Sequence, residues 1–188
     1  MCENLSLTHI CQHCQETFLS PSLYKRQLSN GITVISFYKY SEIKELLHTK
    51  YTDLGYHIYK ILAQLSFKKF ADEFETDEEL VSIGIDDSVK SGYSHTAILN
   101  HSMKSQYIKP LYSKLRATNP ISYSGKSLEY RKDNPRNFQL TKFTAKNIIL
   151  VDDIITTGTT LEQAVKILYE SDKHVLLCLT LADARLKS

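Results

Sequence analysis

The chain has 188 residues, 42% of them hydrophobic, so it can bury one substantial core with a small appendage but not two full domains. Its 23 Lys and Arg against 21 Asp and Glu give a formal charge of +2, which by itself indicates neither a nucleic-acid nor a membrane partner. No apolar run approaches the roughly eighteen residues of a membrane helix, and the N-terminus does not resemble a signal peptide, so we expect a cytoplasmic protein without membrane insertion.

Three of the four cysteines lie within the first fourteen residues, a clustering that is typical of metal binding in a reducing compartment. Cys11 and Cys14 form a Cys-x-x-Cys pair, and Cys2 precedes them, so three thiolates can converge on one tetrahedral Zn²⁺. We therefore predict a structural zinc site on Cys2, Cys11 and Cys14. The fourth ligand stays open, with His9 and His13 as candidates, and free thiols in a frayed terminus are the alternative.

The chain divides into two predicted parts, a zinc-ribbon-like segment over residues 1–22 and a main domain over residues 23–188. Within the main domain, β-branched and aromatic runs predict strands, whereas apolar residues at helical spacing predict helices. In chain order, these elements are a strand over 31–40, a helical stretch from a Ser41 cap to about Phe74 with a break near Gly55, a strand over 81–85, a helix over 94–104 capped by Ser94, a long basic loop over 115–139, a strand over 147–151, a helix around 161–169 and a strand over 174–182.

The last three of these elements give the clearest indication of the fold. Residues 147–151 form an apolar run bounded by polar residues, as expected of a strand that is buried on both faces of a parallel sheet. A glycine-containing loop, a helical pattern and a second buried strand follow it. Strand, loop, helix and strand form a βαβ unit, so we predict an α/β fold with a doubly wound, mostly parallel sheet.

The loop inside this βαβ unit carries the predicted chemistry, because ligands of such folds bind at the carboxyl ends of the strands. Its hydroxyls and backbone N–H groups at a helix N-terminus suit a phosphate, and its glycine allows close approach. The two acids before it need another partner, and the vicinal hydroxyls of a ribose can donate to them. A capping role for one of these acids is the structural alternative. We therefore predict a ribose 5-phosphate site on Asp152, Asp153, Thr156, Thr157, Gly158, Thr159 and Thr160.

The string from Val151 to Thr160 resembles the signature by which class I phosphoribosyltransferases bind 5-phosphoribosyl-1-pyrophosphate (PRPP). Together with the N-terminal cysteines and the stretches 82–95 and 116–138, nearly the full length resembles the ComF family, bacterial phosphoribosyltransferase-like proteins linked to natural competence. The resemblance implies a class I phosphoribosyltransferase fold with a zinc-binding appendage, Mg²⁺ that binds with PRPP, and a role in DNA uptake and transformation.

The resemblance also implies roles for single residues. Asp152 and Asp153 would hold the ribose hydroxyls, and residues 156–160 the 5′-phosphate. Residues 85–92 would form the pyrophosphate loop, although the arginines and the Asn-Gln pair that the family tends to show there are missing. The remaining residues that the resemblance assigns are Asp86, Asp87, Lys90 and Gly92 of that loop, Arg116 and Arg131 as catalytic residues of a mobile basic lid, and Lys126 as a further pyrophosphate partner.

Two classes of function fit this pattern. The first is an enzyme of the glycosyltransferase kind that transfers or releases pyrophosphate from PRPP, with an acceptor base that no residue specifies. The second is a non-catalytic PRPP or nucleotide sensor that binds protein or single-stranded DNA, because tyrosines alternate with cations over 104–136. Proteins of the competence machinery are further candidate partners. An ATPase is rejected, because Pro120 stands where the Walker A motif needs a glycine before Gly125-Lys126-Ser127.

Overall fold

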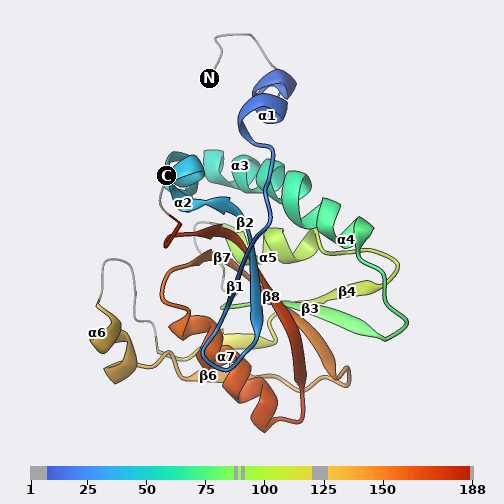
Figure 1. The fold of residues 1–188 in the computed structure, drawn as a ribbon, viewed down its shortest axis with the longest axis vertical. Helices are drawn as coiled ribbons and strands as arrows, with labels where there is room; N and C mark the ends of the chain where they lie inside the picture. The colour runs from blue at the N-terminus through green and yellow to red at the C-terminus, as the bar shows by residue number, and fades with distance from the viewer. Residues whose placement is uncertain (1–7, 87–88, 90–91, 120–126, 187–188) are drawn as a thin grey trace.

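A six-stranded mixed sheet forms the centre of the molecule, as the computed structural model shows for residues 8–86, 89, 92–119 and 127–186 (Figure 1). Five neighbouring strands run parallel, and the edge strand β1 pairs antiparallel to β2. In spatial order the strands are β1 (Tyr24–Gln27), β2 (Thr33–Lys39), β8 (His174–Asp183), β7 (Asn147–Ile155), β3 (Leu80–Gly84) and β4 (Ile108–Leu111). The predicted α/β fold with a mostly parallel sheet is confirmed.

Helices cover both faces of this sheet (Figure 1). One face carries α2 (Tyr40–Leu47), α3 (Asp53–Ala63), the π-helical turn η1 (Gln64–Lys68), α4 (Lys69–Glu73) and α5 (His95–His101). The other face carries α7 (Thr159–Glu170) and a separate two-stranded sheet of β5 (Leu115–Ala117) and β6 (Phe138–Leu140). Two short helices lie outside these layers, α1 (Gln12–Phe18) and α6 (Leu128–Asp133). None of the helices in the described ranges is long and apolar enough to cross a membrane.

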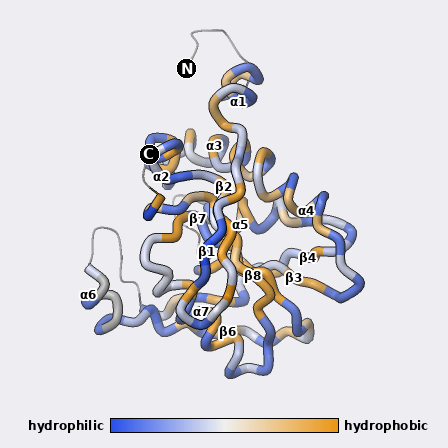
Figure 2. Tube along the Cα trace, viewed as in Figure 1, coloured by the Kyte–Doolittle hydropathy of each residue, from blue (hydrophilic) through white to orange (hydrophobic). Residues whose placement is uncertain are grey.

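The core consists of two apolar clusters, one on each face of the sheet. Along β7, Ile149 and Val151 pack into the cluster under α3 and α5, whereas Ile148 and Leu150 pack into the cluster under α7. This alternation makes the central strands apolar on both faces, which Figure 2 shows as orange along β7 and β8. The strand β1 is hydrophilic in the same figure, with half-buried and exposed residues alternating. It completes the sheet edge without contributing much to the core.

Several predicted boundaries differ from the structure. The strand predicted over 147–151 continues to Ile155, so both acids lie within β7 rather than in a loop. The helix predicted from Ser41 begins at Tyr40 after an N-cap at Lys39, whose backbone N–H donates to Glu42 Oε2 at 2.9 Å. The helical break lies over 48–52, before Gly55 rather than at it.

Four short strands and two short helices were not predicted. The region predicted as a loop over 115–139 contains β5, α6 and β6, because Leu115 and Phe138 are buried under α7 and tie the ends of this region together. The strand β1 was missed because its sequence has no apolar alternation, and β4 because it contains Pro110, a residue that sheets accept at an edge. The described part of the N-terminal segment forms α1.

Candidate functional site

The passage from β7 into α7 lies at the carboxyl edge of the sheet. Gly158 is the N-cap of α7 and has a left-handed backbone with φ of +95°, and no side chain caps the helix there. A Cβ at this position would lie 2.8 Å from Leu28 Cδ2, so only glycine fits. The helix therefore begins with backbone N–H groups that its own N-cap does not satisfy, which is the arrangement that attracts an anion.

The threonines predicted to bind phosphate come together at this helix entrance. Thr157 Oγ1 and Thr159 Oγ1 are 3.0 Å apart, and the backbone N–H of Thr159 donates to Thr157 Oγ1 at 3.4 Å. Glu162 N donates to Gly158 O at 2.9 Å and closes the first turn of the helix. Hydroxyl groups of two of the four predicted threonines and a backbone donor thus lie beside one glycine, and their role in binding a phosphate stays a prediction.

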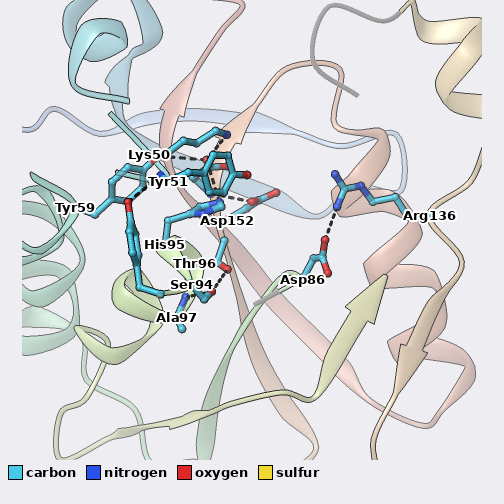
Figure 3. Close-up of polar contacts among 12 residues, drawn as sticks. Lys50, Tyr51, Tyr59, Asp86, Ser94, His95, Thr96, Ala97, Arg136 and Asp152 are labelled. Atoms are coloured by element: carbon cyan, nitrogen blue, oxygen red, sulfur yellow. Dashed lines mark hydrogen bonds and ion pairs between the residues drawn. The ribbon is translucent and has the colours of Figure 1, made fainter. Parts of the chain in front are cut away.

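The carboxylate of Asp153 is buried and surrounded by donors from elements far away in the sequence. Its Oδ2 lies 3.3 Å from Lys50 Nζ, 3.4 Å from Tyr59 OH and 3.4 Å from His95 Nε2. The ring of His95 stands between those of Tyr51 and Tyr59, at centroid distances of 5.5 and 5.6 Å. Figure 3 shows these four side chains gathered beside Asp152. Asp153 is therefore both a candidate ligand group and the counter-ion that holds this cluster together.

A strained turn places Lys50 at the carboxylate. Tyr51 has a positive φ of 73°, and its backbone N–H donates to Tyr93 OH at 3.0 Å. Gly55 lies so close to this turn that a Cβ would meet Thr49 O at 2.1 Å. Glycine is thus required inside α3 because the backbone of the turn packs directly against it.

Asp152 and Asp153 are adjacent, but their surroundings shift their pKa values in opposite directions. Burial raises the pKa of Asp152 well above its ordinary value, and the adjacent charge of Asp153 adds to the rise. Burial also acts to raise the pKa of Asp153, but the charges of His95 and Lys50 outweigh it and hold that pKa below its ordinary value. The two carboxyl groups also hydrogen bond to each other, and Asp152 Oδ1 accepts from Asp153 N at 2.8 Å. The surroundings therefore favour a proton on Asp152 over one on Asp153.

The neighbours of Asp153 keep their protons. Burial lowers the pKa of Lys50, but the charge and hydrogen bond of Asp153, together with Tyr51 and Asp152, outweigh it and hold the pKa above its ordinary value. Burial raises the pKa of Tyr59, and Asp153 raises it further. Lys50 is consequently an ammonium and Tyr59 a phenol over the physiological range, and both can donate to the carboxylate.

Asp86 and Arg136 form a second polar group at the same edge. Asp86 follows β3, which pairs with β7, and its Oδ2 lies 2.8 Å from Arg136 Nη1 (Figure 3). Its Oδ1 accepts from Ala117 N at 3.3 Å, and the backbone N–H of Arg136 donates to Gln163 Oε1 of α7 at 3.1 Å. This ion pair joins the end of β3 to the strand pair β5–β6, and the charge of Arg136 also reaches Asp152.

Other predicted residues lie apart from this centre or outside the described residues. Arg116 is exposed on β5, where its Nη2 donates to Ser113 Oγ at 3.0 Å. Gly92 has a positive φ of 85° with open space around it. Arg131 lies in α6, and only its backbone is described. The predictions for Asp87, Lys90, Lys126 and Cys2 fall outside the described residues.

The predicted zinc ligands within the described residues lie at the start of α1. Cys11 is the N-cap, and its Sγ accepts from Cys14 N at 3.4 Å. Cys14 is buried in the apolar cluster, whereas His9 stacks on His57 of α3 at a centroid distance of 4.0 Å. In the described ranges, no group of three or more His, Cys, Asp or Glu is arranged to hold a metal ion. The zinc site, which also needs Cys2, therefore stays a prediction.

Sequence reasoning did not assign a role at the acid pair to four residues that the structure brings to the site. His95 could have been found, because it directly follows the Ser94 cap where the ComF family tends to show polar amides. Lys50 and Tyr59 carried no local signal, since they meet Asp153 across 103 and 94 residues. Arg136 lies in the basic stretch 116–138, but nothing in the sequence distinguished it from the other cations there.

A family model and several solved structures are similar to this chain. The family model PRTase-CE, in which PRTase denotes phosphoribosyltransferase, matches residues 19–186. Similar solved structures include orotate phosphoribosyltransferase from Aeropyrum pernix, at 18% identity over 91% of this chain and 80% of that chain with a TM-score of 0.39. Adenine phosphoribosyltransferase from Rhodothermus marinus has 14% identity over 91% of this chain and 86% of that chain, with a TM-score of 0.42. A hypoxanthine phosphoribosyltransferase from Staphylococcus aureus has 15% identity over 69% of this chain and 67% of that chain, with a TM-score of 0.41. No curated protein matches the chain.

Proposed function

The chain belongs to the PRTase-CE family, and from this premise we propose that it binds PRPP, or a ribose 5-phosphate group like it, where β7 passes into α7. The observation that supports this proposal is the start of α7, which has no side-chain cap and closely follows the buried Asp153 and the half-buried Asp152. A helix N-terminus with hydroxyls around it favours a phosphate, and a carboxylate accepts hydrogen bonds from sugar hydroxyls. One strand and one helix thus offer complementary groups for the two ends of a ribose 5-phosphate.

In this proposal each group of the site has a separate task. Thr157, Gly158 and Thr159 bind the 5′-phosphate, and Asp152 with the remaining oxygen of Asp153 accepts the 2′ and 3′ hydroxyls. Lys50 and His95 keep Asp153 ionised, so it can accept a hydrogen bond at any physiological pH. The carboxylates also suit Mg²⁺, which would offset the charge of the pyrophosphate when it binds with PRPP.

A second candidate function, a sensor that binds without turnover, is favoured by Asp86 and Arg136. Displacement of pyrophosphate from C1 of PRPP needs cations at the leaving group, because negative charge develops there. Arg136 is 2.8 Å from Asp86, and Lys50 is 3.3 Å from Asp153, so both of these cations are already paired with carboxylates. For Arg136 or Lys50 to stabilise the leaving group, its carboxylate pair would have to exchange for phosphate, whereas binding alone does not require this.

Calorimetric titration with PRPP plus Mg²⁺ tests the proposed site. We expect Thr157→Ala and Asp153→Asn each to weaken binding about tenfold or more, the loss of one or two charge-assisted hydrogen bonds. Thr141→Ala and Asp172→Asn, at exposed positions away from the site, are the matched controls and should bind as the wild type does. No binding of PRPP by the wild-type chain would refute the proposal. Pyrophosphate release from PRPP then separates an enzyme from a sensor.

The remaining predictions from the ComF resemblance are proposals of the same kind. Zinc on Cys2, Cys11 and Cys14 predicts about one metal ion per chain by elemental analysis of the purified protein. Contact with single-stranded DNA predicts that a labelled oligonucleotide gains fluorescence anisotropy with the protein, and that added salt reverses the gain. A role in competence predicts fewer transformants in cells whose copy carries the Asp152→Asn substitution.

A further inference from the structure

A hairpin from the other end of the chain packs against the loop between β7 and α7. The hairpin consists of β1, the turn after it and β2. The guanidinium of Arg26 on β1 donates from Nη2 to Thr156 O at 2.8 Å, across 130 residues of sequence. Two residues further on, Leu28 Cδ2 fills the space where Gly158 would carry a Cβ. The loop that enters α7 is therefore held from behind by residues that no local pattern associates with it.

An aspartate at the end of β8 fixes this arginine. Asp183 is 3% exposed, and its Oδ1 lies 3.3 Å from Arg26 Nη1. The same Oδ1 accepts from the backbone N–H of Arg185 at 2.8 Å. Arg185 Nη2 in turn lies 3.5 Å from Thr157 O, which makes it a longer and weaker second arm. Two successive carbonyl groups of the loop, those of Thr156 and Thr157, thus face guanidinium groups. Asp183 pairs with the guanidinium of Arg26 and with the backbone N–H of Arg185.

A carbonyl held on one side of a trans peptide fixes the direction of the next N–H group on the opposite side. No peptide bond in the described structure is cis, so the contact at Thr156 O directs the N–H of Thr157 away from Arg26. The contact at Thr157 O directs the N–H of Gly158 away from Arg185 in the same way. A charged donor on the carbonyl also polarises the peptide unit and strengthens its N–H as a donor.

We propose that Arg26, anchored by Asp183, is a positioning residue that orients the N–H groups of Thr157 and Gly158 toward the phosphate of a bound ribose 5-phosphate. This inference rests on the proposed function, because it concerns the same site. We assign Arg26 a positioning role, since its Nη2 donates to Thr156 O and its Nη1 is ion-paired with Asp183, where it makes no hydrogen bond. The role requires an arginine, because two nitrogens of one guanidinium reach Asp183 and Thr156 O at the same time.

The test uses ribose 5-phosphate as the probe and the full chain as the protein. Affinity is measured by calorimetry for the wild type, Arg26→Gln, Arg26→Lys and Lys25→Gln. Lys25 is the matched control, because it is an exposed cation on the same strand. We expect Arg26→Gln to bind about tenfold more weakly, the loss of one charge-assisted hydrogen bond, while Lys25→Gln stays within about twofold of the wild type. Arg26→Lys keeps the charge but has one nitrogen for two partners, so we expect about threefold weaker binding.

An amide spectrum distinguishes positioning from a general loss of stability. Saturation with ribose 5-phosphate should shift the Gly158 amide proton downfield in the wild type and markedly less in saturated Arg26→Gln. If Arg26→Gln lowers only the unfolding temperature and leaves this bound-state shift and the affinity unchanged, the inference is overturned and the proposed site stands. Wild-type affinity in Arg26→Lys also overturns it, which covers the case in which Arg26→Gln does not fold. If the wild type does not bind ribose 5-phosphate or PRPP, both proposals fail together.

Discussion

The helices α7 and α6 begin in different ways. Ser127 caps α6, where its Oγ accepts from Tyr130 N at 3.2 Å, whereas Gly158 leaves the start of α7 without a side-chain cap. The side chains that α7 buries are Thr159, Leu161, Ala164, Val165 and Leu168, whereas the described side chains of α6 are all exposed. The helix α7 is packed against the core and has no side-chain cap from its N-cap residue, whereas α6 is capped by its own serine on the surface.

This difference indicates which part of the molecule contributes more to the stability of the fold around the site. Around α7 the acid pair, the glycine and the hairpin form a single packed unit, so a change there should alter stability and ligand affinity together. The region around α6 is joined to the fold through the β5–β6 pair and the Asp86–Arg136 ion pair, so changes there should have smaller and more local effects. The following predictions test this contrast, from the largest expected effect to the smallest.

Gly158→Ala should have the largest effect, because it combines an unfavourable φ with a contact of 2.8 Å to Leu28. We expect the free energy of unfolding to fall by about 2–4 kcal/mol, because alanine is strained in the left-handed region and its Cβ would overpack against Leu28. Gly31→Ala is the control, since Gly31 has a similar φ of +83° with nothing within 4 Å, and should lose only about 1 kcal/mol. Urea unfolding of the two variants measures the difference, and equal losses would show that the hairpin does not restrain the loop.

Asp153→Asn should be next, because it leaves Lys50 and His95 without their shared carboxylate. Removing one partner of a buried ion pair costs about 3 kcal/mol or more, and the lower end applies because the Lys50 side chain is 32% exposed. Asp172→Asn is the control, since its ion pair with Lys146 is fully on the surface and should leave the urea midpoint unchanged. If Asp153→Asn unfolds at the wild-type midpoint, the cluster around Asp153 does not stabilise the fold.

The pH dependence of stability should separate the two acids. The folded pKa of Asp153 is lowered, so its contribution is complete above its unfolded pKa of about 3.9 and is lost as the pH falls through the folded value. The folded pKa of Asp152 is raised, so stability declines as the pH rises from the unfolded toward the folded value. Asp152→Asn should therefore make the ligand-free chain about 1 kcal/mol or more stable at neutral pH, while it weakens PRPP binding. Urea unfolding from pH 3 to 8 checks both signs, and an unchanged profile in Asp152→Asn would contradict them.

Arg136→Gln should have the smallest effect, because it removes one ion pair at the foot of the β5–β6 pair. We expect a loss of about 1 kcal/mol, typical of one partly buried hydrogen bond. The Thr118 and Asn119 amides, which donate to Asn137 O and Arg136 O, should exchange their protons faster. Arg116→Gln, an exposed cation of the same small sheet, is the control and should leave this exchange unchanged. A global increase in exchange for Arg136→Gln would show that α6 and α7 belong to one cooperative unit.

The sequence alone determined the βαβ unit and the chemistry of its loop. Apolar runs over 147–151 and 174–182 predicted the central parallel strands, and the string from Asp152 to Thr160 predicted the helix entrance. These features are local, because strand alternation, helix capping and the space that glycine provides are decided by residues a few positions apart. Because the prediction used only local patterns, it ended this strand before the two acids, whereas pairing with β8 extends β7 through both of them.

Only the tertiary structure decided which charges meet the acid pair. Asp153 takes its partners from the turn before α3, from α3 itself and from the start of α5, and Arg26 reaches the loop from the hairpin at the opposite sheet edge. Isolated cations in a sequence look alike, and burial alone determines whether a charge is solvated or must find a partner. The sequence therefore identified the candidate ligand groups, and the packing of distant elements decided which charged side chains surround them.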